Sequence, residues 1–347
     1  LGWTGGYGLF LMLVLGLAVV VWRRRVQNAP EPAPLAVSAP IAWREKIILV
    51  LLAAAPSSLM LGVTAHLSTD VASAPFLWVA PLALYLLTFV IAFQTRPWIP
   101  LHITLMLQAT LIIMITALVG MATGQWVLLL VLHLACFFFT TLMCHQQMAA
   151  RRPAPDRLTE FYLLMSLGGV VGGAFTALIA PAVFDTVLEY PLVLVLACLA
   201  RPWLGGRPAK RDIWIMTAAL SVAVFVPLMF EMMRYSPSMR GVFTDFGLTK
   251  TAQLILGVAA VCAFLIRDRV VMFTAIVAVM TLSAQHVGRG YDWNLSDRSF
   301  FGVMRVAITR DDAMGGDVHV LMHGTTLHGA QARAPGFACS PTMYYAT

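Results

Sequence analysis

The sequence predicts an all-α polytopic membrane helix bundle, with about ten transmembrane helices, followed by a short C-terminal β-meander. Three observations support this fold class. Hydrophobic residues make up 60% of the 347 residues and charged residues only 11%, which is far from the balance of a soluble domain. The apolar residues form runs of membrane-spanning length, and short basic clusters separate these runs. After residue 288 the chain becomes polar and rich in glycine.

The charge and cysteine patterns exclude two other classes of protein. The net charge of +7 is divided among the basic clusters, which is the pattern of cytoplasmic loops and not of a nucleic-acid-binding surface. The five cysteines are too few and too scattered for a disulfide framework. We therefore expect a lipid bilayer as the partner of this chain, and no nucleic acid.

The helical domain is expected to cover residues 1–288, and it includes a proline-rich linker at 23–46. Its seventh apolar run is barely half the usual length of a span. The ten candidate spans are 6–22, 47–67, 75–93, 101–122, 126–144, 160–180, 189–200, 213–230, 251–266 and 270–286.

The distribution of basic residues supports this division. Fifteen Lys and Arg residues fall in alternate loops from the linker onward, whereas the opposite loops hold only Arg234, Arg240 and Lys250. Because cytoplasmic loops carry an excess of basic residues, the fifteen mark the cytoplasmic side. Ten spans then leave the tail after residue 288 on the extracytoplasmic side.

The central span, within LTEFYLLMSLGGVVGGAFTALIAP, carries four glycines in its middle. Gly168, Gly169, Gly172 and Gly173 form two overlapping pairs at four-residue spacing, so each pair lies on one helical face. Such pairs let a neighbouring helix approach backbone to backbone. A nucleotide-binding loop is disfavoured, because no strand precedes these glycines and their spacing differs. We predict that they pack against another helix.

Four side chains of the fifth span and its end suggest a metal site: His133, Cys136, Cys144 and His145. However, Cys144 lies roughly 16 Å beyond His133 along a helix. Since ligand atoms sit about 2 Å from a metal ion, the four residues cannot share one site. No metal is expected there.

Three polar side chains in or beside the spans are candidates for function: His133, His66 and Asp70. Polar groups are rare in lipid, so each one supports a functional hypothesis, such as an ion or substrate site. The favoured alternative for His133 is a hydrogen bond to a neighbouring helix. For His66 and Asp70, the favoured alternative is an interfacial cap at the end of a span.

The tail, residues 289–347, is expected to form a small β domain. In 299–309 the side chains alternate, with Phe300, Met304, Val306 and Ile308 on one face, which is typical of a strand. Shorter strands are expected at 318–322 and 325–327, after turns. Three short strands lack the residues to bury a core of their own, so the domain needs a partner.

Three histidines lie close together in this tail: His319, His323 and His328. Their spacings of four and five residues match no common zinc pattern, and no acidic residue lies between them. We expect them to be solvated, and we expect no metal in the tail.

Several segments, taken together and in order, resemble bacterial membrane-bound spermidine synthase-like proteins. They are THLSTDVASAPFLWVAPLALYLLTF, LTEFYL with the following GGVVGG, EYPLVLVLACLARP, DRSFFGVMRV and LMHGTTLHGAQ. The resemblance implies a transporter-like membrane region in the bacterial inner membrane, fused to a polyamine aminopropyltransferase-like domain.

In such transferases a small N-terminal β domain precedes a Rossmann-like domain that binds decarboxylated S-adenosylmethionine. The tail resembles that small domain. Phe300 and Phe301 stand where the family has a Tyr-Gln pair, and His323 replaces the aspartate of its turn. Tyr344 is the one matching position, and the resemblance implies that it contacts the amine substrate.

The chain begins at Leu1, and we expect it to be a fragment that lacks the Rossmann-like catalytic domain of its parent. Within the chain we therefore expect no catalytic residue, no cofactor and no aminopropyl transfer. The alternative is a transporter-like or scaffold membrane module whose β tail is vestigial.

Overall fold

The structure is a computed structural model of the chain. It describes residues 2–27, 38–68, 78–118, 126–203, 206–235, 248–288, 293–300, 302–324, 326–337, 339–340 and 342. These residues are mostly helical and end in a small antiparallel sheet, which confirms the coarse fold class expected from the sequence.

The helices begin and end close to the apolar runs of the sequence. They are α1 (Gly2–Gln27), α2 (Trp43–His66), α3 (Val79–Ala92), α4 (Leu101–Ala117), α5 (Trp126–Ala149), α6 (Leu158–Ala174), α7 (Ala180–Val183), α8 (Glu189–Ala197), α9 (Lys210–Tyr235), α11 (Leu248–Leu265) and α12 (Val270–Gly288). A π-helical turn, Phe175–Ile179, joins α6 to α7.

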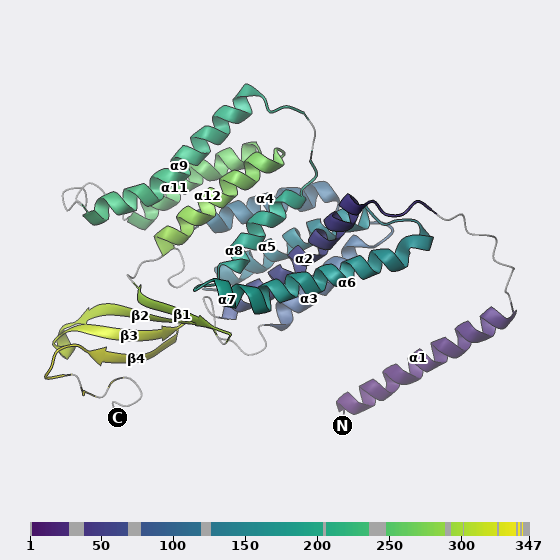
Figure 1. Cartoon of the computed structure of the whole chain (residues 1–347), viewed down its shortest axis with the longest axis horizontal. Coiled ribbons are helices and arrows are strands. Elements are labelled where there is room, and N and C mark those ends of the chain that lie inside the picture. Colours follow the sequence, from purple (N-terminus) through teal and green to yellow (C-terminus); the bar gives the residue numbers. More distant parts are fainter. Residues whose placement is uncertain are drawn as a thin grey trace.

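Among the described residues, five helices are long and apolar enough to cross a membrane: Gly5–Arg23, Trp43–His66, Val127–Ala149, Pro155–Val183 and Lys210–Met232. Five further apolar helices are shorter. The chain is therefore compatible with an integral membrane protein. The helix α1 stands apart from the others in Figure 1, and none of its apolar window is buried.

The basic loops meet at one end of the bundle. Arg151 pairs with Glu45 at 3.1 Å, which joins the end of α5 to the start of α2. Arg269, between α11 and α12, pairs with Asp212 of α9 at 3.0 Å. The strands lie at the other end, beside α7 and the end of α12 (Figure 1).

The closest helix contact joins α2 to α6. An added Cβ at Gly168 would overlap the carbonyl oxygen of Val50 and the side chain of Ala53. One at Gly172 would overlap the backbone of Ala54. The two helices therefore meet backbone to backbone, as small residues permit. We call this contact the α2–α6 seam.

The other two glycines of the predicted set lie beside this contact. A Cβ at Gly169 would meet nothing within 4 Å, although the Gly169 carbonyl accepts a hydrogen bond from Ser57 Oγ at 2.8 Å. A Cβ at Gly173 would lie 3.8 Å from Ser57 Oγ, an ordinary van der Waals contact. Only one face of the glycine cluster thus makes the close approach.

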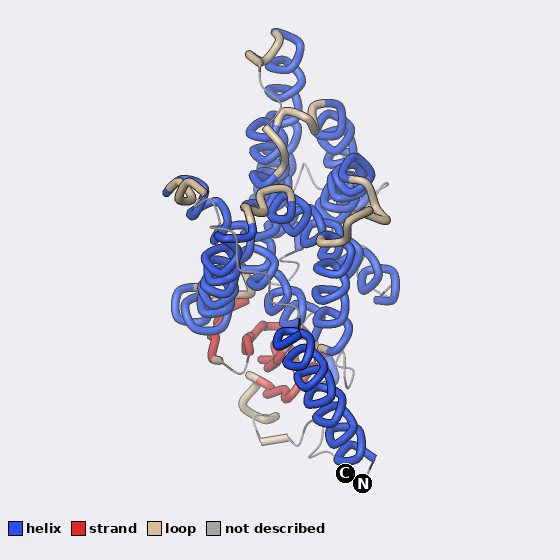
Figure 2. Tube along the Cα trace, turned by 90° about the vertical axis from the view of Figure 1, so that its right-hand side faces the viewer, coloured by secondary structure: helices blue, strands red, loops and turns tan. Residues whose placement is uncertain are grey.

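The tail forms a four-stranded antiparallel sheet in the order β1-β2-β3-β4. Its strands gather in one small layer outside the helices (Figure 2). They are β1 (Trp293–Ser299), β2 (Gly302–Asp311), β3 (Gly316–His323) and β4 (Thr326–Ala332).

Two expectations for the sheet are wrong in detail. Ser299 pairs with Gly302 across a tight turn that contains Phe300, so the expected strand 299–309 is split between β1 and β2. The buried side chains of β2 are Val303 and Ala307, whereas Met304, on the face expected to be apolar, is 52% exposed. Because successive side chains of a strand point to opposite faces, the face of β2 that carries Val303 and Ala307 is the inward one, and Met304 lies on the other face.

Candidate functional site

The helix α8 positions a group of buried polar side chains at the end of the bundle that faces the sheet. Its first two residues, Glu189 and Tyr190, are only 1% and 3% exposed. Burial of such groups is costly unless each one finds a partner. Both do, and their partners come from three other elements of the chain.

Tyr190 lies against two histidines from two other helices. Its hydroxyl is 2.9 Å from Nδ1 of His133 in α5, and its ring stacks on His66 of α2 with 5.2 Å between centroids. The two histidine rings lie 4.6 Å apart. We call His66, His133 and Tyr190 the His–Tyr cluster.

A glycine makes room for this cluster. Gly62, one turn before His66 on α2, would carry a Cβ only 3.2 Å from the Cβ of Tyr190. That is tighter than ordinary packing, so a larger residue at position 62 would push α8 away from α2. The stacking of His66 on Tyr190 therefore depends on the absence of a side chain at Gly62.

Glu189 joins α8 to the sheet. Both of its carboxylate oxygens accept hydrogen bonds from the guanidinium of Arg298 in β1, at 2.7 and 2.8 Å. The Arg298 side chain is 7% exposed and also donates to the Thr186 carbonyl at 2.6 Å. Such two-pronged pairs fix orientation, and removing one partner of a buried pair leaves an uncompensated charge. Arg298 therefore holds β1 against α8.

The structure thus brings together two of the three polar candidates, His66 and His133. His133 makes the hydrogen bond to a neighbouring helix that the favoured interpretation expects. Asp70, the third candidate, and Tyr344 of the tail both lie outside the described residues.

Sequence reasoning missed Glu189, Tyr190 and Arg298 as parts of this site. The available signal was a carboxylate that opens a short apolar run, together with the second arginine that follows the last span. Neither position indicates the other, because 109 residues separate them. Only the fold brings them together.

A second buried polar group lies near the basic loops. Arg201, 3% exposed, donates to the side-chain oxygen of Gln108 and, at 3.0 Å, to the Leu105 carbonyl. Its guanidinium also lies 5.2 Å from the ring centroid of Phe273. This arginine ties the end of α8 to α4 and α12, which is a structural role.

Metal ligation finds no support in the geometry of the described residues, where no group of three or more His, Cys, Asp or Glu side chains could hold an ion. In the tail, His323 and His328 approach one another, with 5.8 Å between ring centroids. The His–Tyr cluster places two imidazoles and a phenol together inside the bundle, with a hydrogen bond between His133 and Tyr190.

Comparison with models of protein families, with curated proteins and with solved structures found no match to this chain. The arguments for function below therefore rest on the geometry and on the sequence.

Proposed function

We propose that the chain is an integral module of the bacterial inner membrane, with about ten membrane-spanning helices, and is the membrane-embedded portion of a spermidine synthase-like protein. Two facts support its membrane character. Five of the described helices are long and apolar enough to cross a membrane, and the basic loops meet at one end of the bundle.

The observation that carries the proposal is the ion pair of Arg298 with Glu189. It fixes a small antiparallel sheet to the bundle directly after the last helix. In aminopropyltransferases a small β domain precedes the catalytic domain, so a sheet anchored in this way would hold a following catalytic domain at the membrane. In this proposal the chain serves as anchor and lid, and a Rossmann-like domain of the parent binds decarboxylated S-adenosylmethionine.

A transporter-like or scaffold module is the second candidate, and two observations favour it. The His–Tyr cluster places polar groups inside an apolar bundle, where such groups commonly mark a pathway for ions or substrates. The sheet also lies at the end of the bundle opposite the basic loops. Because the positive-inside rule places the basic loops in the cytoplasm, it places the sheet outside the cytoplasm. The cosubstrate of the transferase is expected only in the cytoplasm.

Labelling of cysteines introduced at chosen positions, in intact cells, separates the two candidates. The exposed Cys339 is first replaced by serine, and one cysteine is then introduced at Asp297 of β1 or at Ala154, an exposed position beside the basic loops. Labelling at 297 and protection at 154 from an impermeant maleimide would favour the transporter or scaffold. The reverse pattern would favour the transferase module, and equal labelling at both positions would contradict the bundle topology.

Titration calorimetry tests the anchor role directly. The purified chain with decarboxylated S-adenosylmethionine is expected to show no saturable heat, because adenosine recognition needs a strand, a glycine loop and a helix in succession. Saturable binding would place the nucleotide site within this chain and overturn its assignment as an anchor.

A further inference from the structure

The outer face of α9 and α11 carries an apolar groove. It consists of two adjoining depressions that share Val258. The main lining residues are Leu254, Gly257, Val258 and Val261 of α11, with Val222 and Phe225 of α9.

Gly257 opens the middle of this groove. A Cβ at that position would meet nothing within 4 Å. Leu254 and Val261, one turn to either side, are 61% and 62% exposed. Residues 254, 257, 258 and 261 follow helical spacing, so the groove runs along one stripe of α11. The described part of the chain therefore leaves a shallow, open apolar groove on the surface of the bundle.

Among the described residues that line this groove, Lys250 is the one cation, and it lies at one end. Lys250 belongs to the first described turn of α11, its side chain is exposed, and the groove continues from it to Val261. Eleven residues of helix correspond to about 16 Å. Half of the hydrocarbon core of a bilayer is about 15 Å. The groove thus matches the depth of one leaflet, with its ammonium group at the level of the lipid headgroups.

We propose that an anionic phospholipid occupies this groove. Its phosphate lies against the ammonium of Lys250, and one acyl chain follows the surface left open by Gly257. Lysine binds phosphate as a point charge, and basic residues at the membrane interface favour anionic over neutral headgroups. The apolar side chains of the groove match the acyl chain in polarity. This inference rests on the proposed membrane location of the chain.

Native mass spectrometry of the full chain in detergent tests the site, with phosphatidylglycerol and phosphatidylcholine of identical acyl chains as probes. The wild type is expected to bind phosphatidylglycerol about fivefold more tightly, the preference that one interfacial lysine supplies. Lys250→Gln should abolish this preference. Gly257→Leu should fill the groove and weaken the binding of both lipids.

Two control variants match these changes. Lys210→Gln removes an exposed lysine at the other end of α9, and Gly169→Leu adds the same bulk at another open glycine. The lipid site is overturned if the wild type binds both lipids equally, or if either test variant behaves like its control. The exposed Lys250→Gln variant keeps the test decisive should Gly257→Leu fail to fold.

Extraction of cell membranes with alkaline carbonate tests the membrane location of the chain separately from the lipid site. A chain that carbonate releases would overturn the membrane location itself. A chain that resists carbonate, yet binds the two phospholipids equally, would overturn only the lipid site.

Discussion

The α2–α6 seam and the outer face of α9 and α11 both place glycines in the middle of apolar helices, with opposite results. In the seam, Gly168 and Gly172 meet the backbone of α2 with no room for a Cβ. On α11, the space beside Gly257 is open. Glycine permits close approach, but it produces a closed contact only where the facing helix also presents small residues. Here these are Ala53 and Ala54.

Hydrogen bonds reinforce the seam beyond its glycines. Just beyond α6, the hydroxyl of Thr176 in the π-helical turn lies 2.6 Å from that of Ser58 in α2, and both residues are buried. Ser57 donates to the Gly169 carbonyl at 2.8 Å. Bonds of this kind connect transmembrane helices, because a polar group in an apolar bundle needs a partner. Among the residues that line the α9–α11 groove, Ser221 is the only hydroxyl.

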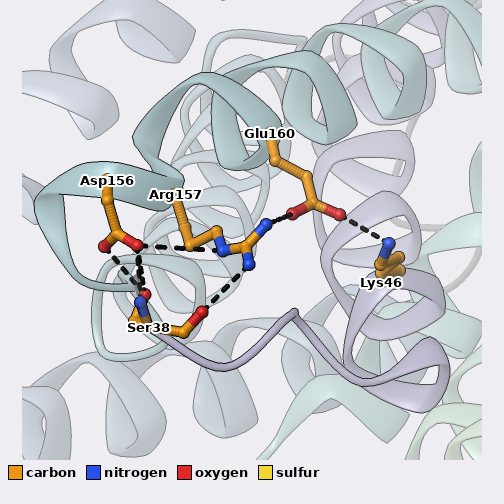
Figure 3. Close-up of polar contacts among 5 residues, drawn as sticks. All are labelled: Ser38, Lys46, Asp156, Arg157 and Glu160. Carbon is orange, nitrogen blue, oxygen red and sulfur yellow. Dashed lines mark hydrogen bonds and ion pairs between the residues drawn. The ribbon is translucent and has the colours of Figure 1, made fainter. Parts of the chain in front are cut away.

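A polar network also clamps the seam at the end where α2 and α6 begin (Figure 3). Asp156 accepts hydrogen bonds from the backbone nitrogen and the hydroxyl of Ser38, and Arg157 donates to the Ser38 carbonyl at 2.9 Å. Lys46 of α2 pairs with Glu160 of α6 at 2.5 Å. The segment before α2 is thereby tied to the start of α6.

The largest effect on stability is expected from a bulky side chain placed in the α2–α6 seam. Gly172→Leu should destabilise the bundle by at least about 3 kcal/mol, the upper end of the usual cost of overpacking. The side chain would displace the backbone of Ala54, which has no rotamer to change. Thermal unfolding in detergent measures the effect, with Gly169→Leu as the matched control. Equal midpoints for the two variants would show that α2 and α6 do not pack through Gly172.

A smaller loss of stability is expected when the hydrogen bond between Ser58 and Thr176 is removed. Ser58→Ala removes one hydroxyl and should cost about 1 kcal/mol, a typical net value for one hydrogen bond. The loss stays moderate because Thr176 also lies 3.3 Å from the Ser58 carbonyl and can donate there. The same change at Ser221, beside the groove, serves as control in the same melts. A larger effect at Ser221 would reverse the assigned roles of the two regions.

The ion pair of Lys46 with Glu160, at the end of the seam, should contribute less to stability than this hydrogen bond. Lys46→Ala breaks a pair whose two side chains are 28% and 27% exposed, so we expect a cost of about 0.5 kcal/mol. Because salt screens exposed charges, the difference from the wild type should shrink as ionic strength rises. A cost that is independent of salt would mean that Lys46 acts through packing of its aliphatic stem.

The smallest effect should come from the open glycine. Gly257→Ala is expected to leave the free energy of unfolding unchanged or to raise it by about 0.5 kcal/mol, because glycine inside a helix loses more backbone entropy on folding than alanine does. The same substitution at Gly172 should lower the midpoint, because even one Cβ overlaps Ala54 there. A lower midpoint for Gly172→Ala together with an unchanged or higher midpoint for Gly257→Ala would support the comparison. A change of the midpoint in the same direction for both variants would contradict it.

The amino-acid sequence by itself determined where the helices lie. The apolar run at 47–67 became α2, Trp43–His66, and even the short run at 189–200 became α8 followed by a 3₁₀ turn. A helix closes its hydrogen bonds within a few residues, so the length of an apolar run and the charges at its ends suffice to place it. The split of the sheet at Phe300 escaped this reasoning, because WNLSDRS in β1 contains only two apolar residues.

Only the tertiary structure decided which residues meet. Nothing in the local sequence distinguishes Gly172 from Gly169. The first packs against the backbone of α2, whereas a Cβ at the second would meet nothing within 4 Å. The same holds for the candidate site, where His66, His133 and Tyr190 come from three helices and Arg298 reaches Glu189 across 109 residues. Such contacts depend on how whole helices pack and rotate against one another. That is a property of the entire set of apolar faces, and no single stretch of sequence encodes it.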